Sequence, residues 1–336
     1  MNAPITMKPL SHLSDGRMVD AYTLTNVHGV SVRILTYGGA IQSIRAPDRD
    51  GEMDDIVLGY DHLERYLESP RYFGCLVGRY AGRIAGGQFS IDGRDYDLDR
   101  NDGASCLHGG SVGFDKTVWA AKAQETRVGA KLTLNHVSPD GDMGFPGELS
   151  VQAVYELTRA NELRLEISAT TTAPTVVNLT NHTYWNLGGL NSRHVRDHQL
   201  QVLADGVLVT DEALLPTGEV RPVAGGELDY RQPRMLADEL DHTFVLTDKK
   251  RGALAPAARL THEGSGRRLQ IDTTEPCLTA YTGWGGVALE TEHAPDAPNQ
   301  ANFLPTLLRP GVVLKTTTVF KLGQSPFRSD CFTQIG

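Results

Sequence analysis

Residues 149–167, LSVQAVYELTRANELRLEI, contain two runs in which apolar and polar side chains alternate. The first run has its apolar residues at every second position, at Leu149, Val151, Ala153, Tyr155 and Leu157, and only Val154 departs from the pattern. The second run places Leu163, Leu165 and Ile167 on one side and Arg164 and Glu166 on the other. Alternation with a period of two predicts β-strands that bury one face.

The same pattern recurs at Val30, Val32 and Ile34, and turn signals separate such runs. The turn signals pair glycine with small polar residues, at Asp92-Gly93, Asp102-Gly103, Asp140-Gly141 and Gly264-Ser265-Gly266. These residues tolerate the positive φ that hairpin turns need. Helical periodicity is scarce, and only residues 61–67 predict one or two turns.

A parallel sheet needs crossover helices, and the sequence offers almost none. We therefore predict an all-β fold, a large antiparallel β-sandwich with few short helices. Because no low-complexity linker and no repeat divides the chain, the prediction is a single domain over residues 1–336.

The composition narrows the class of partner. The chain has 336 residues, a net charge of −9 and a pI near 5.7. An acidic surface disfavours binding to nucleic acid and anionic membranes, so we expect neither as a partner. The charge does not exclude a small neutral ligand. Cys75, Cys106, Cys277 and Cys331 form no C-x-x-C pair and are expected to be reduced. Residues 1–16 lack the apolar region of a secretory signal, so we predict a cytoplasmic protein.

Polar and ionisable residues among glycines and aromatics mark four segments. These are GRYAGRIAGG (78–87), LHGG (107–110), NHTYWNL (181–187) and LETEHAPDAPN (289–299). Glycine lets the backbone approach a ligand, and aromatic rings offer a flat apolar face to the C–H side of a pyranose. Together the segments predict a sugar-binding cleft.

Each candidate side chain also has a purely structural interpretation. His108 can be a hydrogen-bonded loop residue, and Arg83 can be a surface arginine. Strand alternation allows Glu290 to face either water or the interior, and only an inward glutamate becomes a functional candidate with a raised pKa. His182 is the stronger histidine, since the buried polar groups around it would each need a partner in a plain core strand.

Other chemistries lack their usual sequence marks. His194 and His198 are spaced as a helical zinc pair, but the glutamate of an H-E-x-x-H motif is missing and the region does not predict a helix. The sequence also has no G-x-S-x-G, P-loop or G-x-G-x-x-G motif. We therefore expect neither a metal nor a cofactor.

The four segments resemble the aldose 1-epimerase family, also called galactose mutarotases. The resemblance extends to TYGGAIQSI (36–44), GFDKTVW (113–119), GFPGEL (144–149) and DHTFVL (241–246), and the motifs follow the family's order from Tyr37 to about Gly311. It implies a galactose mutarotase-like β-sandwich that interconverts the α and β anomers of a free aldose such as glucose, galactose or a pentose, without a cofactor.

The resemblance also implies residue roles. Glu290 corresponds to the general base that takes the proton from the anomeric hydroxyl, and His182 to the general acid that protonates the ring oxygen. Arg83 and His108 correspond to residues that hydrogen-bond the sugar and steady the charge at the ring oxygen. Asp241 matches an acidic residue that binds sugar hydroxyls, and Tyr184 an aromatic wall. An acid and a base on either side of the anomeric centre suffice for ring opening.

Two departures and three alternatives leave parts of the function open. Gly82 and Thr279 stand where the family commonly has asparagine and glutamine, so the preferred aldose is not assigned. Arg71, Arg79 and Arg83 keep a sugar phosphate possible. The rival functions are a glycoside hydrolase that uses Glu290 with Asp241, and a carbohydrate-binding protein without catalysis. The oligomeric state is not determined by the sequence.

Overall fold

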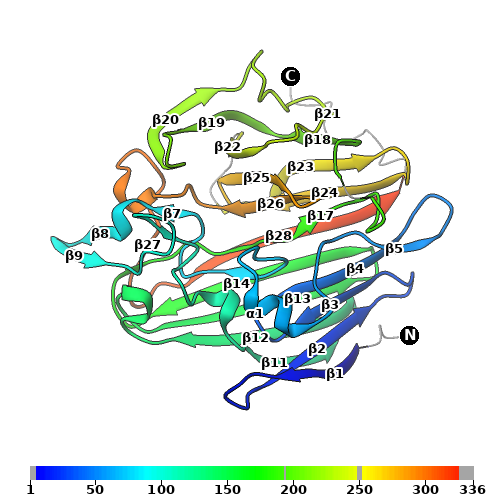
Figure 1. Ribbon diagram of the computed structural model, residues 1–336, viewed down its shortest axis with the longest axis horizontal. Coiled ribbons are helices and arrows are strands. Elements are labelled where there is room, and N and C mark those ends of the chain that lie inside the picture. The colour runs from blue at the N-terminus through cyan, green and yellow to red at the C-terminus, as the bar shows by residue number, and fades with distance from the viewer. Residues whose placement is uncertain (1–4, 193, 248–251, 325–336) are drawn as a thin grey trace.

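The protein is described by a computed structural model, which covers residues 5–192, 194–247 and 252–324. Most of the chain forms antiparallel strands (Figure 1). The described part contains one α-helix, α1 (Leu63–Glu68), which overlaps the predicted helical segment 61–67 and ends one residue later. It also contains short 3₁₀ turns, η1 (Ala85–Gly87), η2 (Phe114–Lys116), η3 (Asp142–Gly144) and η4 (Ala297–Asn299). None of the helices in the described part is long and apolar enough to cross a membrane.

Three large sheets build the molecule. The first has the order β1 (Ile5–His12), β2 (Met18–Thr25), β3 (Ser31–Leu35), β4 (Ile41–Pro47), β5 (Met53–Asp55). The second has the order β11 (Ala120–Glu125), β12 (Gly129–Ser138), β13 (Leu149–Thr158), β14 (Glu162–Thr171), β28 (Leu314–Gln324), β24 (Arg267–Thr273), β23 (Ala255–His262), β18 (His198–Val202), β21 (Arg234–Met235). The third has the order β17 (Tyr184–Trp185), β26 (Gly286–Glu292), β25 (Cys277–Gly283), β22 (Asp241–Leu246), β19 (Ala204–Thr210), β20 (Pro216–Pro222).

The remaining strands of the described part form short two-stranded ladders. They are β6 (Leu76–Val77) with β16 (Thr180–Asn181), β7 (Arg83–Ile84) with β10 (Cys106–Leu107), β8 (Gln88–Ile91) with β9 (Arg94–Asp97), and β15 (Thr175–Val176) with β27 (Leu307–Leu308). The predicted turn at Asp92-Gly93 joins β8 to β9, and both residues have positive φ, 53° and 79°.

The strands quoted first from the sequence pair with each other in the nine-stranded sheet. Leu157 lies opposite Leu163, and Tyr155 opposite Leu165, so the two apolar faces point the same way. All of these residues are buried, as the alternation predicts. The C-terminal strand β28 then inserts between β14 and β24 and completes this sheet from both halves of the chain (Figure 1).

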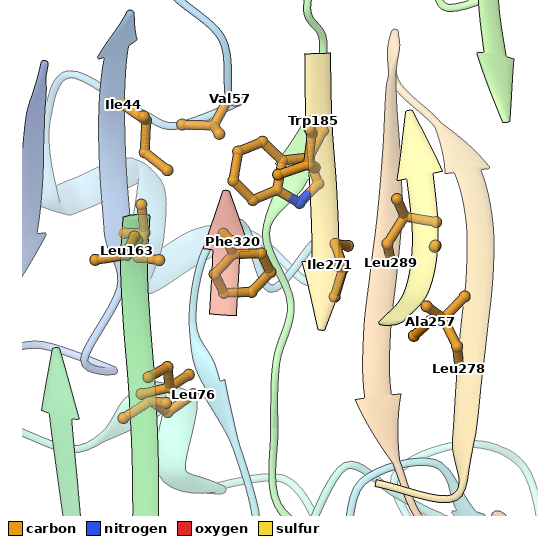
Figure 2. Close-up of a cluster of buried hydrophobic side chains, with 14 of the residues drawn as sticks. Ile44, Val57, Leu76, Leu163, Trp185, Ala257, Ile271, Leu278, Leu289 and Phe320 are labelled. Atoms are coloured by element: carbon orange, nitrogen blue, oxygen red, sulfur yellow. The ribbon is translucent and has the colours of Figure 1, made fainter. Parts of the chain in front are cut away.

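The main core lies between the sheets. One continuous cluster takes buried residues from all three, among them Ile44, Leu163, Ile271 and Leu289 (Figure 2). Trp185 and Phe320 meet at its centre with ring centroids 5.2 Å apart. Sheets that share one core in this way form a sandwich, so the predicted class, an antiparallel β-sandwich with few short helices, is confirmed.

Candidate active site

All six candidate residues line one cleft. They are Arg83, His108, His182, Tyr184, Asp241 and Glu290, from segments that are far apart in the sequence. The cleft contains about 1140 Å³ of empty space, part of which is open solvent. Its size and its mixture of aromatic and polar side chains suit a small polar ligand.

Strand β26 determines which way Glu290 points. Val287 and Leu289 belong to the main core, and Thr291 shares a 2.6 Å hydrogen bond with Thr318 of the nine-stranded sheet. Because successive side chains alternate across a strand, Glu290 must face the opposite side, which is the cleft. The sequence left its direction open. The structure places Glu290 inward and 3% exposed.

His182 touches Glu290 directly. Its Nε2 atom lies 3.3 Å from Glu290 Oε1, and both side chains are buried. Backbone hydrogen bonds hold the histidine from both sides, because its N–H donates to Cys75 O and its carbonyl accepts from Gly74 N. The two groups are therefore direct neighbours on one wall of the cleft.

Burial shifts the ionisation of both groups. Desolvation lowers the pKa of His182 to about 4. It also raises the pKa of Glu290 well above its ordinary value, and the nearby carboxyl groups of Glu292 and Asp241 raise it further. Both shifts favour the neutral pair, imidazole with carboxylic acid. That pair differs from imidazolium with carboxylate only by one proton moved across the 3.3 Å contact.

The polar residues around His182 explain how distant segments come together. Asn178 Nδ2 donates to the carbonyls of Ala81 and His293, each at 3.0 Å, and its Oδ1 accepts from His293 N. This side chain therefore ties the GRYAGRIAGG segment to the LETEHAPDAPN segment. Asn181 donates to Gly74 O at 2.7 Å. These partners are what buried amides require.

The β7–β10 ladder brings Arg83 and His108 into the cleft. Leu107 pairs with Arg83, and His108 follows with a φ of 53°. His108 Nδ1 accepts from Gly82 N at 3.2 Å, so the proton of the neutral ring sits on Nε2 as a donor. Burial holds the pKa of His108 well below its usual range, and the nearby His182 and Arg83 lower it further. Arg83 Nε donates to Asp102 Oδ2 at 2.7 Å.

Aromatic rings form a stack on the His182 side of the cleft. Tyr184 stacks on His182 with ring centroids 4.9 Å apart. Tyr72 covers the other face of the imidazole at 5.8 Å and meets the His108 ring edge-on at 4.7 Å. Tyr72 was missed by the sequence analysis, because a tyrosine before Phe73-Gly74 carries no signal of its own. The cleft lining also includes residues not proposed as site residues: Thr243, Thr279, Tyr281, Trp284 and Glu292.

Asp241 lies at the start of β22, opposite Tyr281 of β25. It is exposed at the rim, while Glu290 is at the buried end of the same cleft. Partial burial raises the pKa of Asp241, and the nearby Arg83 and His242 oppose this shift. A carboxylate in this position can accept hydrogen bonds from sugar hydroxyls.

Two other candidate groups have structural partners. Arg79 is buried and donates to Ser138 Oγ and to the carbonyls of Ser138, Pro139, Pro146 and Gly147, so it is not part of the cleft. His198 lies in a strand, and its Nε2 accepts from Leu187 N. Asp197 contacts both His198 Nδ1 and His262 Nε2, at 3.0 and 3.2 Å. The nitrogens of His198 are thus taken up by hydrogen bonds, as in a structural cluster.

Gly82 is a point where the backbone approaches closely. It has a φ of 77°, and a Cβ atom there would lie 2.7 Å from both Cβ and Cγ of Pro295. A proline ring cannot rotate away. Since Gly82 also bonds the His108 backbone and ring, a side chain at this position would displace His108.

We expect Gly82→Ala to cost more stability than the roughly 1–3 kcal/mol of left-handed strain alone, and to lower kcat/KM. Gly86→Ala is the matched control, because Gly86 has a φ of 64° in the same segment with nothing within 4 Å. Urea unfolding and mutarotation rates of both variants test this. Equal losses would contradict the collision with Pro295.

The chain is similar to known proteins over most of its length. A family model described as Aldose 1-epimerase matches residues 20–321. The chain is 41% identical to the galactose mutarotase of Bos taurus over 315 residues, which are 86% of this chain and 90% of that protein. It is 34% identical to the aldose 1-epimerase of Escherichia coli K12 over 337 aligned positions, covering 91% of this chain and 96% of that protein.

A solved structure shows the same fold. The crystal structure of galactose 1-epimerase from Lactobacillus acidophilus superimposes with a TM-score of 0.85 at 28% identity, over 96% of this chain and 99% of that one. The family match covers far more than half of the residues, and two relatives exceed 30% identity over most of their length. The chain belongs to the aldose 1-epimerase family.

Proposed function

We propose that Glu290 is the general base and His182 the general acid of an anomer interconversion in this cleft. The chain is an isomerase of the aldose 1-epimerase type, which interconverts the α and β anomers of an aldose. The observation that carries the residue assignment is the 3.3 Å contact between Glu290 Oε1 and His182 Nε2. A base and an acid in contact suit this reaction, because the two oxygens that exchange protons are both bonded to C1 of the sugar.

The reaction opens and recloses the ring. Glu290 takes the proton from the hydroxyl on C1, and that oxygen becomes the carbonyl oxygen of an aldehyde. The C1–O5 bond breaks, and His182 delivers its proton to O5. After rotation about C1–C2, O5 attacks the other face of the carbonyl, while His182 takes back the proton and Glu290 returns its own. The net change is inversion at C1, with no redox step.

The ionisation that burial favours at the site matches one half of this cycle. When the ring is open, Glu290 carries a proton and His182 is neutral. Burial favours the same neutral pair, since it raises the pKa of Glu290 and lowers that of His182. The pocket therefore stabilises the protonation state that accompanies the aldehyde. Binding of the cyclic sugar requires the proton to return to His182.

The remaining residues bind and orient the sugar. Arg83 and the Nε2–H of His108 are donors beside His182, where the charge on the ring oxygen changes. Asp241 accepts from hydroxyls at the rim, and Tyr184 packs against the apolar C–H side of the ring. The relatives named galactose mutarotase support a free monosaccharide as the substrate, such as glucose, galactose or a pentose.

A cytoplasmic location is proposed as well, and the free buried thiols of Cys75, Cys106 and Cys277 support it. Cys331 lies outside the described residues.

The pH dependence should show a broad plateau. The reaction needs the Glu290–His182 pair to hold one proton. Below about pH 4, the lowered value for His182, both groups are protonated and no base remains. Above the raised pKa of Glu290 the last proton is lost and no acid remains. We expect kcat/KM against pH to fall on the acid side near 4, not near 6.5. An acid limb near 6.5 would contradict a desolvated His182.

Polarimetry tests the function itself. Freshly dissolved α-D-glucose, α-D-galactose, D-xylose and L-arabinose are followed with and without enzyme in a buffer that catalyses mutarotation poorly. Faster approach to an unchanged final rotation is the expected result, and the rates rank the sugars. If no sugar relaxes faster than its blank, the assignment fails, and glucose 6-phosphate is the next substrate. Release of reducing sugar from a glycoside would instead indicate a hydrolase.

A further inference from the structure

A second buried carboxyl group lies in the cleft and has no part in the proton transfers. Glu292 follows Glu290 by two residues on β26, so both side chains face the cleft. Glu292 is 2% exposed and Glu290 is 3% exposed. Burying a carboxyl group is expensive unless it is neutral or well partnered. Glu292 therefore needs an explanation beyond packing.

The partners of Glu292 fix the direction of a hydrogen-bond chain. Thr279 Oγ1 donates to Glu292 Oε1 at 2.5 Å. Thr279 has only one hydroxyl proton, so in its 2.7 Å contact with Thr243 Oγ1 it must accept. The chain thus runs from Thr243 through Thr279 to Glu292. Thr243 and Thr279 lie opposite each other on β22 and β25, and Thr279 lies opposite Glu290 on β26, so this polar row crosses the floor of the cleft.

The second carboxyl oxygen of Glu292, Oε2, is not used by the Thr243–Thr279 chain. Oε2 is buried and has no hydrogen-bond partner within the described part of the chain. Burial raises the pKa of Glu292 to about 8, the Thr279 hydrogen bond opposes this, and Glu275 and Asp241 add to it. The group therefore carries a proton at neutral pH. Since Oε1 already accepts from Thr279, that proton sits on Oε2 as an unused donor.

We propose that Glu292 and Thr243 together bind one hydroxyl group of the sugar other than the anomeric hydroxyl. Glu292 Oε2–H donates to the hydroxyl oxygen, and Thr243 Oγ1, which has a free lone pair, accepts the hydroxyl proton. The inference rests on the proposed function, because it places the sugar in the cleft with C1 at Glu290.

Spacing along the strand separates this subsite from the anomeric centre. Two residues of a β-strand span about 6–7 Å, which is comparable to the width of a pyranose with its substituents. Glu290 serves the C1 hydroxyl, so Glu292 lies beside a hydroxyl further along the ring. A neutral donor also avoids adding a second charge next to Glu290 and Asp241. Glu292 is thereby a specificity-determining residue.

Monodeoxy sugars test the proposal. Mutarotation kinetics are measured for the preferred aldose and for each deoxy analogue lacking one non-anomeric hydroxyl. We expect Glu292→Ala to lower kcat/KM for the parent sugar about tenfold, the size of one hydrogen bond to a buried group. For one deoxy analogue, the variant and the wild type should differ by less than about threefold, because the hydroxyl that Glu292 binds is already missing.

Glu292→Gln is the conservative variant. Its amide oxygen can accept from Thr279, and its NH₂ can donate where Oε2–H did, so the parent sugar should keep its kcat/KM within about threefold. Thr243→Val removes the other half of the subsite with little change in shape. It should lower kcat/KM for the parent sugar but differ little from the wild type for the same deoxy analogue. It also keeps the proposal testable if the alanine variant does not fold. Asp272→Asn, a buried carboxyl paired with Lys321 outside the cleft, controls for general destabilisation.

The outcomes separate the inference from the function. Equal losses for all sugars in the panel would overturn the subsite and assign Glu292 an electrostatic effect on Glu290. A glutamine variant as impaired as the alanine variant would overturn the neutral donor. A wild-type enzyme that accelerates no sugar overturns the proposed function and the inference with it.

Discussion

Glu290→Gln is expected to reduce kcat/KM for mutarotation by roughly 10²-fold or more. The amide keeps the size and hydrogen-bonding contacts of the carboxyl group but cannot take up the proton of the C1 hydroxyl. The fold should tolerate the change, because burial already favours the neutral acid at this position. Polarimetry at substrate saturation and below it separates kcat from KM, and the loss should appear mainly in kcat.

Asp272→Asn serves as the control for Glu290→Gln. It neutralises another buried carboxyl, in the nine-stranded sheet, where Asp272 pairs with Lys321 at 2.7 Å. This variant should unfold more easily and still turn over normally. Near-normal turnover in Glu290→Gln would overturn the base assignment, and equal losses in both variants would reduce it to a stability effect.

His182→Ala is also expected to lose mutarotation by roughly 10²-fold or more. Without the imidazole, the group that contacts Glu290 and protonates O5 is lost. The deletion also leaves a gap between Tyr72 and Tyr184, whose rings stack on either side of His182. Added imidazole can enter this gap, so it should restore part of the rate above its own background catalysis. A lost structural contact would not respond in this way.

His136→Ala is the control for His182→Ala. His136 lies in β12, where its ring packs against Phe114 and Trp119, and it does not line the cleft. Its replacement should lower stability and leave kcat unchanged. If His182→Ala retains normal turnover, or if imidazole gives no rescue at any concentration, His182 is not the acid.

The fold class could be predicted from local patterns. Each long strand carries its own burial signal, as in Leu163, Leu165 and Ile167, because alternation is imposed by strand geometry and needs no distant partner. The hairpin at Asp92-Gly93 is equally local. The order of strands was not predictable. That β28 inserts between β14 and β24 depends on contacts between residues about half the chain apart.

The site was predicted in part. The segments around Arg83, His108, His182 and Glu290 stood out because glycine, aromatic and ionisable residues rarely combine in ordinary strands, and the resemblance gave them roles. Tyr72 gave no such signal, and its importance comes only from two rings placed beside it by the fold. Glu292 could be read from the LETE motif, but the sequence did not show that Thr279 of the neighbouring strand β25 donates a hydrogen bond to it.

The sequence by itself determined the strands, the turns, the β-rich class and the family, since these follow from local spacing and from motifs in a fixed order. Only the tertiary structure decided that Glu290 faces inward, that it touches His182, and that Arg79 is structural. The physical reason is that burial and side-chain contacts arise only when segments far apart in the sequence pack against each other. The pKa of Glu290 is raised by desolvation and by carboxyl groups that the packed sheets bring near it, and neither exists in the extended chain.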